Sequence, residues 1–90
     1  MQITLHQFEQ IDGLFRHCLH ARPSLEQCLK YDHATATRMY FTPEWKLLDV
    51  CIEAIGYDAA NAFPSTIDCA ASIVTDALLC KIDVVDEVAA

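Results

Sequence analysis

Apolar residues recur at three- and four-residue steps near the start of the chain. This spacing places them on one face of a helix, which we expect over residues 5–21. Thr4 and Gln7 form the T-x-x-Q pattern of a capping box at its start, and Pro23 limits its end. The inner face is expected to hold Phe8, Ile11, Leu14, Phe15, Cys18 and Leu19.

Two short helices are expected next. Ser24 begins an S-x-x-Q capping box, which predicts a helix over 25–31 whose inner face holds Leu25, Cys28 and Leu29. Asp32 would lie in the middle of that face if the helix continued. We therefore expect a break or cap at Asp32 and a separate short helix over 33–40. The alternation in 33–41 leaves a strand open as the alternative.

The most apolar helix is expected over 43–55. Thr42 and Pro43 are typical of an N-cap and a first helical position, and Gly56 is typical of a helix end. Apolar residues cover most of the circumference and leave only a narrow polar stripe. This distribution predicts a central helix surrounded by the others. Its expected core residues are Leu48, Cys51, Ile52 and Ile55.

The remaining residues predict one connection and one more helix. Residues 57–65 are expected to form the connection, with room for a helical turn after Asp58. Ser65 is a candidate N-cap for a last helix over 66–82. Its extension past Ile82 stays open. The inner face is expected to hold Ile67, Ala70, Ala71, Val74, Ala77, Leu78 and Ile82.

Composition agrees with a helical protein. The chain of 90 residues has only 2 glycines and 3 prolines, which favours helices joined by short connections. We predict an all-α fold, a small compact bundle of four to five helices, forming a single domain over 1–90. The apolar share of 53% is more than so small a domain is expected to hide, which favours a homodimer.

The charge is unevenly distributed. The formal net charge is -7, and it comes from residues 41–90, because the acids and bases of residues 1–40 balance. An acidic chain without clustered Lys and Arg argues against nucleic acid as a partner. The sequence has no secretory signal and no stretch that predicts a membrane span. Its 5 cysteines form no close pair, so we expect reduced thiols in a cytoplasmic protein.

The segment HCLH, residues 17–20, raises the question of a metal site. On a helix, Cys18 falls on the apolar face, and His17 and His20 fall on the opposite side. The two histidines supply two ligands, fewer than a zinc site needs. We therefore expect neither a metal nor a cofactor. The other cysteines read mostly as core positions and no catalytic motif is present, so the sequence favours a function other than catalysis.

These observations predict a small acidic helical protein of adaptor or inhibitor type that binds a partner protein and self-associates. The segment 31–45, rich in aromatic residues, is the expected dimer contact. The alternative is a small ligand- or metal-binding protein, or an enzyme, that uses the histidine-bearing N-terminal half. The candidate partner-binding residues are Gln10, Gly13, His17, His20, Tyr40, Trp45, Asp76 and Asp83.

Overall fold

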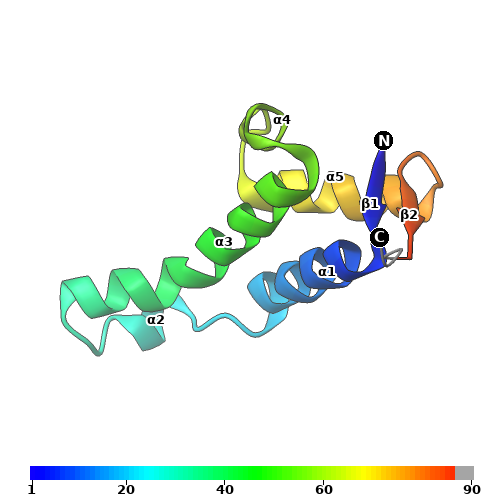
Figure 1. The fold of residues 1–90 in the computed structure, drawn as a ribbon. Coiled ribbons are helices and arrows are strands. Elements are labelled where there is room, and N and C mark those ends of the chain that lie inside the picture. Colours follow the sequence, from blue (N-terminus) through cyan, green and yellow to red (C-terminus); the bar gives the residue numbers. More distant parts are fainter. Residues whose placement is uncertain (87–90) are drawn as a thin grey trace.

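The structure is a computed structural model that describes residues 1–86 (Figure 1). The expected fold class is confirmed: the described chain is a helical bundle, to which a very small sheet is added. In chain order the elements are β1 (Gln2–Thr4), α1 (Leu5–His20), α2 (Leu25–Cys28), α3 (His33–Ile55), α4 (Tyr57–Asn61), α5 (Thr66–Leu78) and β2 (Asp83–Val85).

The capping box at the start of α1 forms as expected. The Thr4 hydroxyl accepts a hydrogen bond from the Gln7 backbone N–H at 3.0 Å, and Oε1 of Gln7 accepts one from the Thr4 N–H at 2.9 Å. Ile11 and Cys18 are buried on the predicted inner face. Leu19 lies outside that face and is exposed, because it is about 100° around the helix from the buried Cys18.

Helix α3 differs most from the expectation. The predicted cap at Asp32 is confirmed, since its carboxylate accepts a hydrogen bond from the Thr35 N–H at 3.2 Å. The predicted break before Pro43 is wrong, because one helix runs from His33 to Ile55 with Pro43 inside it. The strand alternative for 33–41 is also wrong, because these residues are helical. Pro43 has no N–H to donate, but it is buried on the same face as Leu47 and Cys51, so packing holds the helix together.

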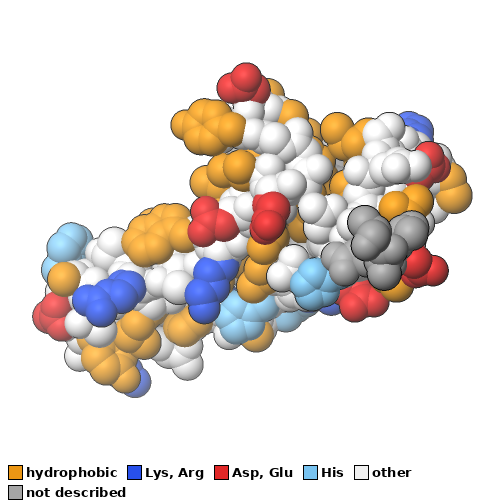
Figure 2. Space-filling model, in the orientation of Figure 1, with side chains coloured by type: hydrophobic (Ala, Val, Ile, Leu, Met, Phe, Trp, Pro, Cys, Tyr) orange, Lys and Arg blue, Asp and Glu red, His pale blue; other side chains and the backbone are white. Residues whose placement is uncertain are grey.

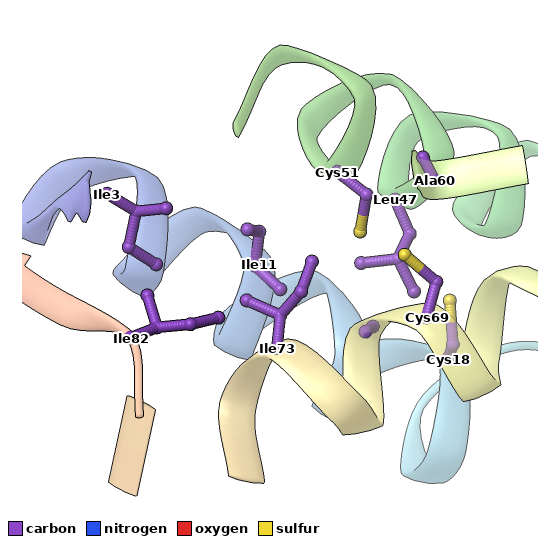
Figure 3. Close-up of a cluster of buried hydrophobic side chains, with 10 residues drawn as sticks. Ile3, Ile11, Cys18, Leu47, Cys51, Ala60, Cys69, Ile73 and Ile82 are labelled. Carbon is purple, nitrogen blue, oxygen red and sulfur yellow. The ribbon is translucent and has the colours of Figure 1, made fainter. Parts of the chain in front are cut away.

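The core lies where α1, α3 and α5 meet (Figure 3). Helix α3 contacts each of the other four helices, as its apolar character predicts. Cys51 is fully buried, as expected, but the central leucine is Leu47 rather than Leu48. Leu48, Ile52 and Ile55 are only half-buried at the edge of the core. They sit on a neighbouring side of α3.

A glycine joins α3 to α4. Gly56 ends α3, as expected, and has a φ of 95° and a ψ of 156°, a conformation that is essentially confined to glycine. Helix α4 then begins at once with Tyr57 and lies within the expected connection. Its Ala60 is buried in the core. The glycine therefore turns the chain sharply enough for α4 to pack back onto α3.

The chain returns to its start through a parallel strand pair. Ile3 of β1 lies opposite Val84 of β2, and the Asp83 N–H donates to the Met1 carbonyl at 3.0 Å. The predicted helix over 66–82 therefore ends early, at Leu78. The break follows from Cys80, whose φ is 60°, so that Ile82 reaches the core from a turn. Leu78 is exposed rather than inward-facing.

The molecule is elongated. Its principal extents are 46 × 26 × 23 Å, and its radius of gyration is 14.6 Å. A compact chain of this length is expected to have a radius of gyration of about 12 Å. Figure 1 shows the reason: α2 and the first half of α3 project from the rest of the bundle. We call residues 22–46 the arm and the remainder the body. None of the helices in residues 1–86 has the length and apolar character needed to cross a membrane.

The two glycines give a direct test of the backbone argument. Beyond the chain neighbours and the local helix backbone, no atom lies within 4 Å of a Cβ added at either site, so differences must come from the backbone. We expect Gly56→Ala to lower the free energy of unfolding by about 1–3 kcal/mol, because of its positive φ. Gly13→Ala, inside α1, is expected to raise it by up to about 1 kcal/mol. Urea unfolding of both variants measures this, and equal effects would contradict the model of the α3–α4 turn.

Two adjacent leucines test the phase of α3. Leu47 is fully buried, whereas Leu48 is at the core edge. We expect Leu47→Ala to cost about 2–5 kcal/mol of unfolding free energy and Leu48→Ala clearly less, because a smaller cavity forms. Thermal or urea unfolding of the pair checks the order. A larger loss in Leu48→Ala would show that α3 is rotated relative to this structure.

Candidate interaction surface

The arm is built by α2 packing against α3. The predicted capping box at Ser24 forms. The Ser24 N–H donates to Oε1 of Gln27 at 3.0 Å, and the Ser24 hydroxyl accepts from the Gln27 N–H at 3.1 Å. Cys28 is fully buried and Ala36 of α3 nearly so. Helix α2 ends at Cys28, earlier than the expected 25–31, and a turn continues from it. A single turn of helix thus covers only one side of α3.

Arg22 fixes the base of the arm. Its guanidinium carbon lies 4.3 Å from the centre of the Tyr40 ring, a cation–π contact. Its Nη1 lies 3.4 Å from the Glu44 carboxylate, and both side chains are largely shielded from solvent. A long hydrogen bond of 3.5 Å joins Nη2 to the Tyr40 hydroxyl. These contacts tie the loop after α1 to the middle of α3 and so set the position of α2.

A shallow apolar groove runs along the arm. It has a volume of about 350 Å³. Leucines of α2 form one wall, and side chains of the first half of α3 form the floor and the other wall. Its lining is mostly apolar and aromatic, with one histidine at its end. The lining residues are Leu25, Leu29, His33, Ala36, Thr37, Tyr40 and Phe41.

Aromatic rings continue the groove along α3. Tyr40 and Phe41 meet edge to face at 5.0 Å, and Phe41 stacks on Trp45 with ring centres 6.1 Å apart. Exposed fractions are 57% for Leu25, 70% for Leu29, 40% for Phe41 and 50% for Trp45. Figure 2 shows hydrophobic side chains spread over the arm, beside its charged groups. The arm therefore presents a continuous apolar surface to solvent.

The charge of the arm differs from that of the body. The arm contains four of the chain's six Lys and Arg residues and three acids, a formal charge of +1. Because the whole chain is at -7, the body carries -8. The basic residues of the arm are Arg22, Lys30, Arg38 and Lys46. The apolar surface thus lies on a part of the molecule that is close to neutral.

The candidate residues predicted from sequence fall in separate places. Trp45 is exposed on the apolar surface of the arm, and Tyr40 is half-buried in the groove under Arg22. Asp76 is half-buried on α5. Asp83 is exposed in β2, away from the arm (Figure 1). Four residues are exposed along α1, and they are Gln10, Gly13, His17 and His20.

Two leucines of the surface are missing from the sequence prediction. Leu25 and Leu29 are expected to face inward with Cys28, but only Cys28 does so. Helix α2 is a single turn that packs mainly against α3, so it buries one residue and leaves the flanking pair in solvent. Their exposure follows from the early end of α2 at Cys28, and the sequence contains no signal for that end.

The histidines and cysteines offer little for a metal site. Within residues 1–86, no three side chains of His, Cys, Asp or Glu gather closely enough to hold a metal ion. Cys18, Cys28, Cys51 and Cys69 are buried as free thiols, and Cys80 is exposed. Burial raises the pKa of Cys51 to about 12, and the adjacent Cys69 adds to the shift. Such a thiol stays protonated at neutral pH and is a poor nucleophile.

Comparison with family models, with curated proteins and with solved structures finds no match to this chain.

The buried thiols predict a loss of stability at alkaline pH. The pKa of Cys51 is about 12 in the folded protein, above the ordinary value of about 8.5 for an unfolded chain. Its contribution is therefore complete below pH 8 and is lost as the pH rises from about 9 to 12. Urea unfolding across this range should show a smaller fall for Cys51→Ala than for the wild type. Cys80→Ala is the control, and an equal fall in all three proteins would contradict the assignment.

Proposed function

We propose that this protein is a small helical protein–protein interaction module, of adaptor or inhibitor type, and that the arm is its binding surface. The observation that carries the proposal is an exposed apolar surface. Leu25, Leu29 and Phe41 line one groove in it, and Trp45 stacks on Phe41. Exposed apolar patches of this kind are uncommon on a monomer and are often binding sites. Large aromatic side chains are also the residues that contribute most to binding energy in interfaces.

The shape of the surface favours a helical partner. The groove is open, runs between α2 and α3, and is lined by apolar groups with few polar ones. An amphipathic helix binds such a groove by placing one apolar face into it. Glu26, Lys30 and Arg38 on the arm are exposed and supply charged groups around that contact. A partner helix with an apolar face therefore fits the arm better than an extended peptide does.

A cytosolic location is part of the proposal. It is supported by the five cysteines, all of which are free thiols. The alternative function, a ligand or metal site in the N-terminal half, has weaker support. His17 and His20 are exposed at the end of α1, and no third ligand gathers with them in the described chain. The geometry favours the arm.

Affinity capture with matched variants tests the proposal. Immobilised wild-type protein, the Phe41→Asp/Trp45→Asp double variant and a Leu78→Asp control are compared on extract from the native host. Leu78 is 72% exposed on α5, away from the arm (Figure 1). A partner of the arm should be retained by the wild type and the control and lost from the double variant.

Titration of each protein with the purified partner then measures whether the arm is the binding surface. The partner is expected to bury Phe41 and Trp45. Replacing both rings with carboxylates should therefore weaken binding by more than about 30-fold, which corresponds to at least 2 kcal/mol. Circular dichroism of each variant shows that the fold is kept. Equal binding of the purified partner to all three proteins would overturn the arm as the binding surface.

A further inference from the structure

We infer that the arm binds a second copy of this chain, with the two arms antiparallel about a two-fold axis near Phe41. The inference rests on the proposed function, because it uses the same surface and names its partner. It follows from four features of the described residues: the spacing of a second apolar stripe on α3, the fit of one side chain to the groove, the exposed area and the charge.

Helix α3 has two apolar faces. One is buried within the chain and includes Pro43, Leu47 and Cys51. The other follows steps of four, three, four and three residues, which is the spacing that one helix uses to pair with another. The end of this stripe in the body is half-buried, and the end on the arm is exposed. Its members are Phe41, Trp45, Leu48, Ile52 and Ile55.

The stripe and the groove are complementary when two copies meet. In an antiparallel pair with its axis at Phe41, the residue four positions after Phe41 lies opposite the residue four positions before it. Trp45 of one copy therefore lies opposite Thr37 of the partner copy, and Thr37 lines the groove. Each half-exposed indole would enter the groove of the other copy. Such a contact is self-complementary, as a two-fold interface requires.

The exposed apolar area of the arm is close to what a stable pair needs. With about 150–200 Å² for each large apolar side chain, Leu25, Leu29, Phe41 and Trp45 expose about 400 Å² together. A standard interface buries about 800 Å² on each partner, of which a little over half is apolar. Thr37 and Leu48, both half-buried, border the same surface and add to it. The arm thus supplies most of the apolar area that a standard dimer needs.

Charge favours this contact over others between copies. Two bodies, each at -8, repel one another, whereas the arm is at +1. An antiparallel pair of arms keeps the two bodies at opposite ends. It also places the tip of each arm beside the acidic body of the other copy. The tip carries Lys30 together with Glu26 and Asp32, so it has little net charge to repel that body. Contact through α5 or α1 would bring the acidic bodies together instead.

Sedimentation equilibrium from roughly 1 to 100 µM tests the pair. The wild type and Leu78→Asp are expected at twice the monomer mass of 10.1 kDa at the upper concentrations. Trp45→Asp is expected to weaken dimerisation by at least roughly 30-fold while keeping its helical circular dichroism. A wild type that stays monomeric overturns this inference and leaves the proposed function to the capture experiment. A dimer that Trp45→Asp does not weaken overturns the arm as the contact.

Spin-label distances test the geometry without disturbing the stripe. Arg38→Cys and Glu53→Cys, each in a Cys80→Ser background, place one label at an exposed position of α3. With a rise of 1.5 Å per residue, labels at position 38 should lie within roughly 20 Å of each other and labels at 53 about 36 Å apart or more. Short distances at both positions would indicate parallel arms and overturn the two-fold antiparallel arrangement.

Discussion

The continuity of α3 through Pro43 determines the shape of this molecule. A proline inside a helix removes one backbone hydrogen bond, here to the Met39 carbonyl, and costs about 3 kcal/mol relative to alanine. Pro43 is nevertheless buried, and it lies on the face that carries Leu47 and Cys51 into the core. A break at this point would let the first half of α3 fold back on the body. The unbroken helix instead carries α2 outward and creates the arm.

The consequence is that one helix serves two purposes. In the body, α3 is packed between α1, α4 and α5, and its buried face joins the core of free thiols and branched side chains in Figure 3. In the arm, the same helix packs mainly against α2, and Arg22 contacts it at the base. Its second apolar stripe is half-covered at Leu48 and uncovered at Phe41 and Trp45. The boundary between the half-buried and the exposed part of this stripe therefore lies along a single helix, near Pro43.

The parts of this fold that the sequence predicts are the local ones. Thr4, Ser24, Asp32 and Ser65 each accept a hydrogen bond from a backbone N–H three residues on, an interaction that is contained within a few residues. The all-helical class follows from composition in the same way. Trp45, a predicted partner-binding residue, is exposed on α3, and its role in binding stays a prediction.

The remaining features depend on contacts between distant segments. The pairing of β1 with β2 joins the two ends of the described chain. Each strand has only three residues, too few for an alternating pattern that would predict the pairing. The choice between Leu47 and Leu48 as the buried residue depends on how α3 is rotated against α1 and α5. Leu25 and Leu29 are exposed because α2 ends after one turn. The spacing of apolar residues within a segment does not predict how that segment packs against distant ones.

The arm is held to its own chain by few interactions, and this affects how binding acts on it. Cys28, Ala36 and Pro43 are its buried residues. Arg22 contacts Tyr40 and Glu44 at its base. A segment with so little buried surface opens at a lower free energy than the body does. A partner that covers Phe41 and Trp45 would add to the packing of α2 on α3 and stabilise the arm by mass action. Order in the arm and occupation of its surface are therefore coupled, while the core around Leu47 and Cys51 keeps the body folded in either state.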